Sequence, residues 1–275
     1  VTFGQVYLQD INLDNADLRR TNLANSILSR SSLREANLHF ARLNEADFQG
    51  ANFQNAILFK ADFSGAVPKG ANLVEANLSE AILQGTDLED ANFRKANLKG
   101  ADLRGANLKK AILEDANFRK ANLTGANLRG ASLRGANLTF AKLNGANFQG
   151  VNFKNALLTQ ADLSDAILKG VNLFGTNLSK MNLKGADLEE VNFSEANLRG
   201  AHLRGADLKK AVLQNADFRK ANLAGSNLGG ANLRGANLVF AKLNGANFQE
   251  ANFQNALLTQ ADFSEAILKE ANLSG

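Results

Sequence analysis

The residues that could carry out chemistry in this chain are few and far apart. The sequence has 275 residues, no cysteine, and two histidines, His39 and His202. Without cysteine there is no thiolate nucleophile, and histidines this distant cannot build a Ser-His-Asp triad or a metal cluster together. Carboxylates are abundant, but the repeat described below predicts that they lie on a convex outer surface, which offers no pocket that would shift their pKa values. The sequence therefore predicts a protein that is not an enzyme, with no catalytic residue, metal site or cofactor.

Aromatic residues recur at regular spacing and could bind another protein. Phe40, Phe140 and Phe240 are evenly spaced along the chain, in turn positions that are otherwise polar or Gly. We expect His39 and Phe59 to stack beside Phe40. Exposed aromatic side chains can anchor protein partners, so these five residues form a candidate partner patch. The alternative is that each Phe merely folds over a corner.

Basic residues raise the question of nucleic-acid binding. The chain has 31 Lys and Arg against 27 Asp and Glu, a net charge of +4. Most basic side chains have acidic neighbours in the arrangement derived below. The exceptions are two like-charged pairs, Lys99–Arg119 and Arg199–Arg219, which form a candidate basic patch. A solvated, self-paired surface is the simpler interpretation, and we do not expect nucleic acid to be the partner.

A five-residue repeat must position all of these side chains. Written in blocks of five, the chain reads Ala-Asn/Asp-Leu/Phe-x-x without insertion or deletion, and the third position is Leu or Phe in 54 of 55 blocks. The first position is Ala in 42 of 55. A period of five fits neither a helix nor a plain strand. It fits a short extended piece with Ala and Leu/Phe pointing inward, followed by a polar corner.

The charges indicate how many blocks make one coil. Outward side chains one coil apart lie about 5 Å from each other, where opposite charges attract. At a spacing of four blocks there are 16 opposite and 7 like pairs, against 12 and 14 at three blocks and 5 and 14 at five blocks. Arg94–Glu114 and Lys95–Asp115 are examples of opposite pairs at four blocks. The sequence thus predicts an all-β, four-sided helix of about 14 coils, each with about 20 residues.

A second layer of repetition and one irregularity complete the pattern. Residues 101–175 match 201–275 at 56 of 75 positions, as if the regions 101–200 and 201–275 were duplicates. No linker interrupts the chain, so we expect one domain over 1–275. Pro68 alone breaks the Leu/Phe series and lacks the N–H that a ladder needs, which predicts a local bulge or a notch. Phe3 and Leu273 occupy centre positions close to the termini, which predicts end-to-end stacking or a flanking domain.

Runs such as Ala121-Asn122-Leu123-Thr124-Gly125 resemble the pentapeptide-repeat proteins along the whole chain. The resemblance implies a right-handed quadrilateral β-helix with Leu/Phe and the preceding Ala buried. The family is abundant in cyanobacteria and mostly of unknown function. One branch resembles B-DNA and binds DNA gyrase, and another is a secreted effector. This chain is slightly basic, and it lacks the loop insertion and terminal dimerisation element of the gyrase-binding branch.

Three functions remain open at this point. The preferred one is a non-catalytic scaffold that binds protein, and the alternatives are a DNA mimic directed at gyrase and a basic nucleic-acid binder. The longest apolar run is about four residues, far from the roughly 20 that a membrane span needs, and no signal peptide is visible. We therefore expect a soluble protein, with cytoplasm and periplasm both open.

Overall fold

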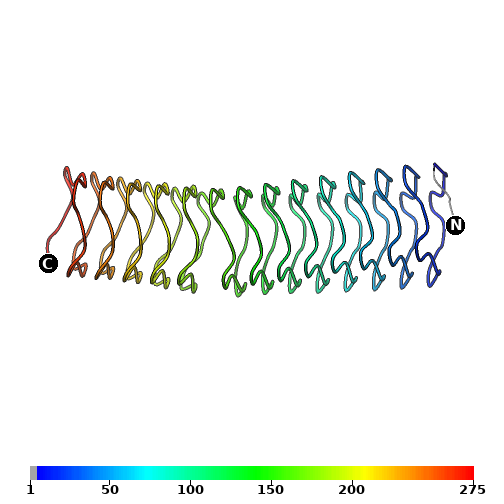
Figure 1. Ribbon diagram of the computed structural model, residues 1–275, viewed down its shortest axis with the longest axis horizontal. Coiled ribbons are helices and arrows are strands. Elements are labelled where there is room, and N and C mark those ends of the chain that lie inside the picture. Colours follow the sequence, from blue (N-terminus) through cyan, green and yellow to red (C-terminus); the bar gives the residue numbers. More distant parts are fainter. Residues whose placement is uncertain (1–4) are drawn as a thin grey trace. The chain divides into compact units, whose positions relative to one another are not determined.

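The computed structural model describes residues 5–275, and Phe3 lies outside this part. The chain divides into two compact units. The first unit contains residues up to Lys142 together with Val151–Leu157, and the second contains Leu143–Gly150 and Leu158–Gly275. Within each unit the chain winds into stacked coils (Figure 1). The expectation of a single domain stays a prediction, and each unit is described by itself below.

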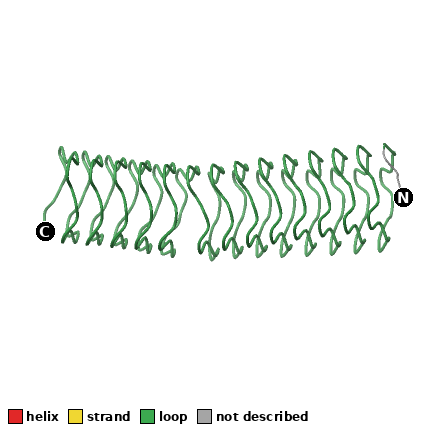
Figure 2. Cartoon of the chain, viewed as in Figure 1, coloured by secondary structure: helices red, strands yellow, loops and turns green. Residues whose placement is uncertain are grey.

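The described residues contain no α-helix and no continuous strand, and the chain is drawn as loops and turns throughout (Figure 2). Each block between residues 6 and 270 contributes one bridge residue, its second, followed by a two-residue turn at the fourth and fifth positions. The bridges are parallel and join equivalent blocks of successive coils, as in Asn77↔Asn97 and Asn97↔Asn117 of the first unit and Asp207↔Asn227 of the second. The predicted coil length of four blocks is therefore correct.

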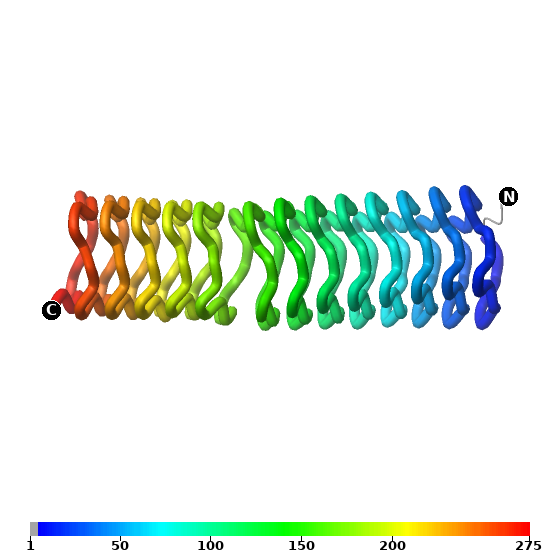
Figure 3. The backbone as a smooth tube through the Cα atoms, turned by 90° about the horizontal axis from the view of Figure 1, so that it is seen from below, coloured from blue at the N-terminus to red at the C-terminus, as the bar shows by residue number. Residues whose placement is uncertain are grey.

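The coils have four sides, which we call A, B, C and D in chain order. In the coil 41–60, side A is 41–45, side B 46–50, side C 51–55 and side D 56–60, and the same assignment is used for the other described coils of each unit. Figure 3 shows the coils from a second direction. Within each unit, side chains with the same block position on the same side of consecutive coils are thus neighbours.

Four of the five backbone N–H groups in a block bond to other backbone groups. In block 36–40 the N–H of Ala36 donates to Leu33 O and closes the preceding turn. The N–H of Asn37 donates to Ala16 O of the preceding coil. The third and fifth N–H groups donate to the following coil, as in Leu38 N to Ile57 O at 2.8 Å. The fourth N–H lacks such a partner. It needs a side chain or water, because an unpaired buried N–H is costly.

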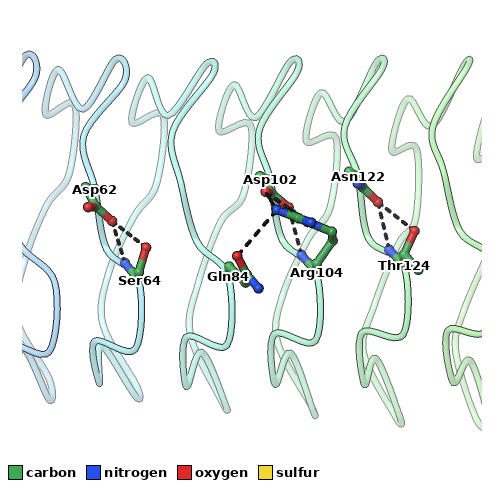
Figure 4. Close-up of polar contacts among 7 residues, drawn as sticks. All are labelled: Asp62, Ser64, Gln84, Asp102, Arg104, Asn122 and Thr124. Carbon is green, nitrogen blue, oxygen red and sulfur yellow. Dashed lines mark hydrogen bonds and ion pairs between the residues drawn. The ribbon is translucent and has the colours of Figure 1, made fainter.

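The Asn or Asp at the second position provides that partner. Its Oδ1 accepts the N–H two residues later, as Asp62 does from Ser64 at 2.9 Å and Asn122 from Thr124 at 3.1 Å (Figure 4). Short polar side chains favour such local contacts with the backbone. The preference for Asn and Asp follows from this bond.

The fifth position has a left-handed backbone in nearly every block. Non-glycine residues there have positive φ values, such as 58° at Glu75, and the glycines are similar, such as Gly85 at 65°. This region costs side-chain-bearing residues about 1–2 kcal/mol each. The turn therefore explains the frequent Gly at block ends.

The core of each unit consists of the inward Ala and Leu/Phe side chains, which are almost all buried. Phe48, Phe53 and Phe63 form one ring cluster in the first unit, with centroids 5.1–5.8 Å apart. Buried first-position hydroxyls are also satisfied, since Thr86 Oγ1 donates to Phe63 O at 3.0 Å. Small first-position residues allow the larger third-position side chains to fill the coil.

Pro68 keeps the register of its coil. It is buried in a third position, Ala71 N still donates to Pro68 O, and Gly70 N still donates to Glu89 O. The bridge between Val67 and Asp87 is absent, because proline has no N–H to donate. The structure thus has a missing rung at this place instead of the predicted bulge.

Candidate functional site

An aromatic cluster lies on the corner that follows side D in the first unit. The His39 ring is stacked on Phe59 at 5.0 Å and meets the edge of Phe40 at 4.3 Å, and Phe40 and Phe59 are 6.0 Å apart. We call these three residues the aromatic corner. His39 and Phe40 end one block and Phe59 belongs to the next coil, so the coil register brings them together. The predicted stacking is confirmed.

Cationic side chains surround the aromatic corner. Lys60 Nζ lies 5.7 Å from the centroid of Phe40 and 5.2 Å from that of Phe59, and the Arg20 guanidinium lies 5.8 Å from Phe40. Such contacts are favourable because the ring face is electron-rich. Lys60 also forms an ion pair with Glu80 at 3.3 Å. Sequence reasoning missed both cations, although Arg20 and Lys60 lie one coil to either side of Phe40 and the coil length could have identified them.

The surface beside the aromatic corner is hollowed. An open depression of about 510 Å³ is lined by Asp17, Arg19, Arg20, Thr21 and His39. The Arg19 guanidinium donates to the Asp17 carboxylate and lowers the pKa of Asp17 to about 2. Asp17 therefore holds Arg19, whereas Arg20 forms no ion pair in the described part of the chain. The corner thus combines an apolar surface with an available positive charge.

Phe140 and Phe240 are not part of this cluster. Phe140 belongs to the first unit, where the Arg119 guanidinium lies 5.7 Å from its centroid. Phe240 belongs to the second unit and is 52% exposed, against 39% for Phe40. Within residues 5–275 Phe240 has no ring or cation contact. The structure therefore brings together three of the five patch residues predicted from the sequence.

One residue of the predicted basic patch has an acidic partner in the structure. Arg219 is not unpaired, because its guanidinium donates to Asp217 at 2.6 and 2.9 Å and lowers the pKa of that carboxyl. The sequence count compared only residues one coil apart and overlooked this pair within a block. Arg119 packs on Phe140, and Lys99 and Arg199 have no ion pair in the described part of the chain. Lys99 and Arg119 lie in the first unit, whereas Arg199 and Arg219 lie in the second.

Some acidic side chains pair with basic side chains one coil away, and Glu89 and Glu114 each pair with two of them. Glu114 lies 2.8 Å from Arg94 and 3.2 Å from Arg134, one coil to either side, and the hydrogen bond from Arg94 is the main reason for its lowered pKa. Lys95 pairs with Glu75 at 3.5 Å, and among the described residues it makes no pair with Asp115. Pairing between successive coils is thus observed, although individual partners differ from the prediction.

The described residues hold no group of three or more His, Asp and Glu side chains that could bind a metal ion. Residues 5–275 also lack any helix with the length and hydrophobicity of a membrane span. The other surface depressions are open and lined mainly by polar side chains.

Comparison with protein families and comparison with solved structures give the same result. A family model described as pentapeptide repeats matches residues 3–67, 71–109 and 111–275 in several segments. Among solved structures, the chain is similar to HetL, a pentapeptide repeat protein involved in heterocyst differentiation regulation from Nostoc sp. strain PCC 7120. The identity is 33%, covering 96% of this chain and 89% of that one, with a TM-score of 0.35.

Two further structures are less similar. Rfr23 from Cyanothece 51142 is 26% identical over 55% of this chain and 90% of its own, with a TM-score of 0.29. QnrB1, a plasmid-mediated fluoroquinolone resistance protein, is 18% identical over 69% and 94%, with a TM-score of 0.28. A search of curated protein sequences gives no significant match.

Proposed function

Because this chain belongs to the pentapeptide-repeat family, with its right-handed quadrilateral β-helix fold, we propose that it is a non-catalytic scaffold that binds protein partners through the aromatic corner. The observation that carries this proposal is the cluster of His39, Phe40 and Phe59, whose rings contact one another on the outside of the coils. Binding hot spots are enriched in Trp, Tyr and Arg, and the aromatic corner likewise places aromatic rings beside an arginine, Arg20.

The backbone at Phe40 has a conformation that glycine adopts more easily. Its φ is 58°, in a position where glycine is common and a bulky residue is strained. Nearly every fifth position shares this conformation, so the φ value alone does not single out Phe40. The same left-handed position holds Phe140 and Phe240, with φ values of 62° and 60°. A turn that glycine would satisfy thus carries an exposed ring in each case.

The corner selects for a particular kind of partner segment. Phe40 and Phe59 offer apolar surface, and Arg20 offers a guanidinium that can bind a carboxylate in bidentate geometry. A partner segment with an apolar side chain next to an acidic one could contact the two rings and pair with Arg20 at the same time. The charges do not favour a DNA mimic, because carboxylates such as Glu89 and Glu114 are each shared by two basic residues.

The test compares partner capture by three forms of the full chain. Phe40→Gly together with Phe59→Ser removes the rings while suiting the turn at residue 40. Phe174→Ser is the control, because Phe174 is a 54% exposed ring in the second unit, outside the aromatic corner. We expect the control to retain the bound proteins and the double variant to lose them without a fall in melting temperature, because glycine suits the left-handed turn. Equal capture by all three forms would refute the proposal, as would a double variant that unfolds, since the rings would then serve stability.

A further inference from the structure

A hollow on side A of the second unit is lined by basic side chains and by no carboxylate. It has a volume of about 450 Å³ and is lined by Asn182, Lys184, His202, Arg204 and Asn222. Lys184, His202 and Arg204 are exposed, and the two asparagines are half-buried. This hollow lies outside the aromatic corner, which belongs to the first unit.

The ladder of the β-helix holds these residues in adjacent coils. His202 forms parallel bridges with Asn182 and Asn222, and its N–H donates to Met181 O at 2.9 Å. Lys184 and Arg204 both follow at the fourth position of their blocks, one coil apart. They are therefore neighbours on the same side, about 5 Å apart at the backbone. Ala224 occupies the next fourth position, where a small side chain leaves the surface open.

The first unit contains a matched arrangement that is neutralised. There the equivalent residues are Gln84, Asp102 and Arg104. The Arg104 guanidinium donates to both Asp102 oxygens, at 2.8 and 2.6 Å, and reaches Gln84 Oε1 at 3.4 Å (Figure 4). The hydrogen bond from Arg104 lowers the pKa of Asp102. In this copy the arginine is therefore occupied by its own block.

Two differences between the copies create a cationic cluster in the second unit. His202 stands where Asp102 stands, so Arg204 loses its carboxylate, and Lys184 replaces Gln84. In the part of the chain that the structure describes, the side chains of Lys184, His202 and Arg204 make no hydrogen bond or ion pair. Two like charges are thus adjacent without a neutralising partner, which is unfavourable unless an anion is bound.

Two carboxylates lie in the preceding coil of the same side, Asp162 and Asp165, and among the described residues neither forms an ion pair with the cluster. The Asp165 side chain packs against Gly185, next to Lys184. Asp162 accepts Asn182 Nδ2 at 2.8 Å and Ser164 N at 3.0 Å. Asn182 Oδ1 in turn accepts the N–H of Lys184 at 3.3 Å. Asn222 accepts the N–H of Ala224 at 3.1 Å. The amide oxygens around the hollow are therefore committed to the backbone, and the three basic side chains remain available to a ligand.

We propose that Lys184, His202 and Arg204 form a binding site for a phosphate group. A guanidinium presents a planar pair of donors that matches two phosphate oxygens, and a lysine ammonium can bind a third. The imidazole of His202 supplies a further N–H donor. A phosphate dianion would balance the charges of Lys184 and Arg204. Inorganic phosphate, a phosphorylated small molecule and a phosphorylated protein segment share this chemistry.

The first experiment titrates the intact chain with inorganic phosphate and follows backbone amide shifts by NMR. We expect saturable shifts on side A around residues 182–204, with a millimolar dissociation constant. His202→Asp should weaken binding about tenfold, because the new carboxylate would hold Arg204 as Asp102 holds Arg104, and each exposed charged contact contributes a factor of about 2–5. Asn192→Asp on side C is the control, since it changes the net charge equally and keeps the acceptor used by Ser194 N. It should bind as the wild type does.

Three outcomes would overturn the proposal. The first is the absence of saturable amide shifts up to about 50 mM phosphate, which is far above the millimolar dissociation constant expected for a few exposed contacts. The second is equal weakening of phosphate binding by His202→Asp and Asn192→Asp. The third is a set of amide shifts spread over all basic residues of the chain. A gain-of-site variant gives an independent check. Gln84→Lys with Asp102→His in the first unit should create a second phosphate site there, and its failure to do so while remaining folded would also count against the proposal.

A last comparison distinguishes the sources of the phosphate group. Phosphate, a phosphoserine peptide and the same peptide with serine are titrated separately, with acetate as a carboxylate probe. Tighter binding of the phosphoserine peptide than of phosphate would assign the site to a protein segment, and equal binding would assign it to small phosphorylated ligands. Acetate binding as tight as phosphate would refute the phosphate assignment.

Discussion

The amide ladder on side D of the first unit has a direction, and its direction can be tested. Asn117 Nδ2 donates to Asn97 Oδ1 at 3.2 Å, and Asn97 Nδ2 donates to Asn77 Oδ1 at 3.3 Å. Ile57 precedes Asn77 in this column, so Asn77 is the first rung and serves as an acceptor. An aspartate accepts but cannot donate when ionised. It should therefore be tolerated at the first rung and not at the second.

The magnitudes follow from the bonds that each substitution removes. Asn77→Asp keeps all three bonds accepted by Oδ1, from Ser79 N, Ser79 Oγ and Asn97 Nδ2, so its effect should be within about 0.5 kcal/mol. Asn97→Asp loses one donated bond and places two acceptors together, which should cost about 1 kcal/mol. Asn97→Ala loses three bonds, including the one from Lys99 N, and should cost about 2 kcal/mol.

Urea unfolding of the wild type and the three variants measures these differences, and hydrogen exchange locates them. The Lys99 amide should lose protection in Asn97→Ala and keep it in Asn97→Asp, because the carboxylate still accepts its N–H. Equal destabilisation by Asn77→Asp and Asn97→Asp would refute the directional ladder. Unchanged Lys99 protection in Asn97→Ala would refute the role of the side chain in the turn.

Three further predictions concern an ion pair, the missing rung and the core. Because the Arg19 hydrogen bond lowers the pKa of Asp17 to about 2 from an ordinary 3.8, its stabilising effect should be complete above pH 3.8 and lost as the pH falls through about 2. Arg19→Gln should move the carboxyl titration, followed by ¹³C NMR, back toward 3.8. Pro68→Leu should restore the bond to Asp87 O and raise stability in urea by about 1 kcal/mol, and a loss of stability would show that the cavity is shaped for proline. Phe118→Ala should cost about 3–5 kcal/mol in the same assay, because Phe118 is fully buried, and a cost below about 1 kcal/mol would contradict the packing described.

The amino-acid sequence was sufficient to derive the coil and its register. The Leu/Phe series, broken only at Pro68, and the charge pattern predict which side chains are buried and which are neighbours, because a solenoid places equivalent residues of successive coils side by side wherever they occur. The stacking of His39, Phe40 and Phe59 followed from that register alone. Local turn chemistry was equally readable, since Asn and Asp at the second position are the residues that accept backbone N–H groups at a bend.

Which of several neighbours make contact depended on the folded structure. Lys95 lies beside both Glu75 and Asp115, yet among the described residues it pairs only with Glu75. Arg219 pairs with Asp217 within its block, and Pro68 removes one rung without shifting the chain. Side-chain rotamers and the direction in which each donor points choose between equally close partners, and a one-dimensional spacing rule contains neither. The cationic hollow around His202 became visible only when its neutralised counterpart at Asp102 was seen to hold its arginine.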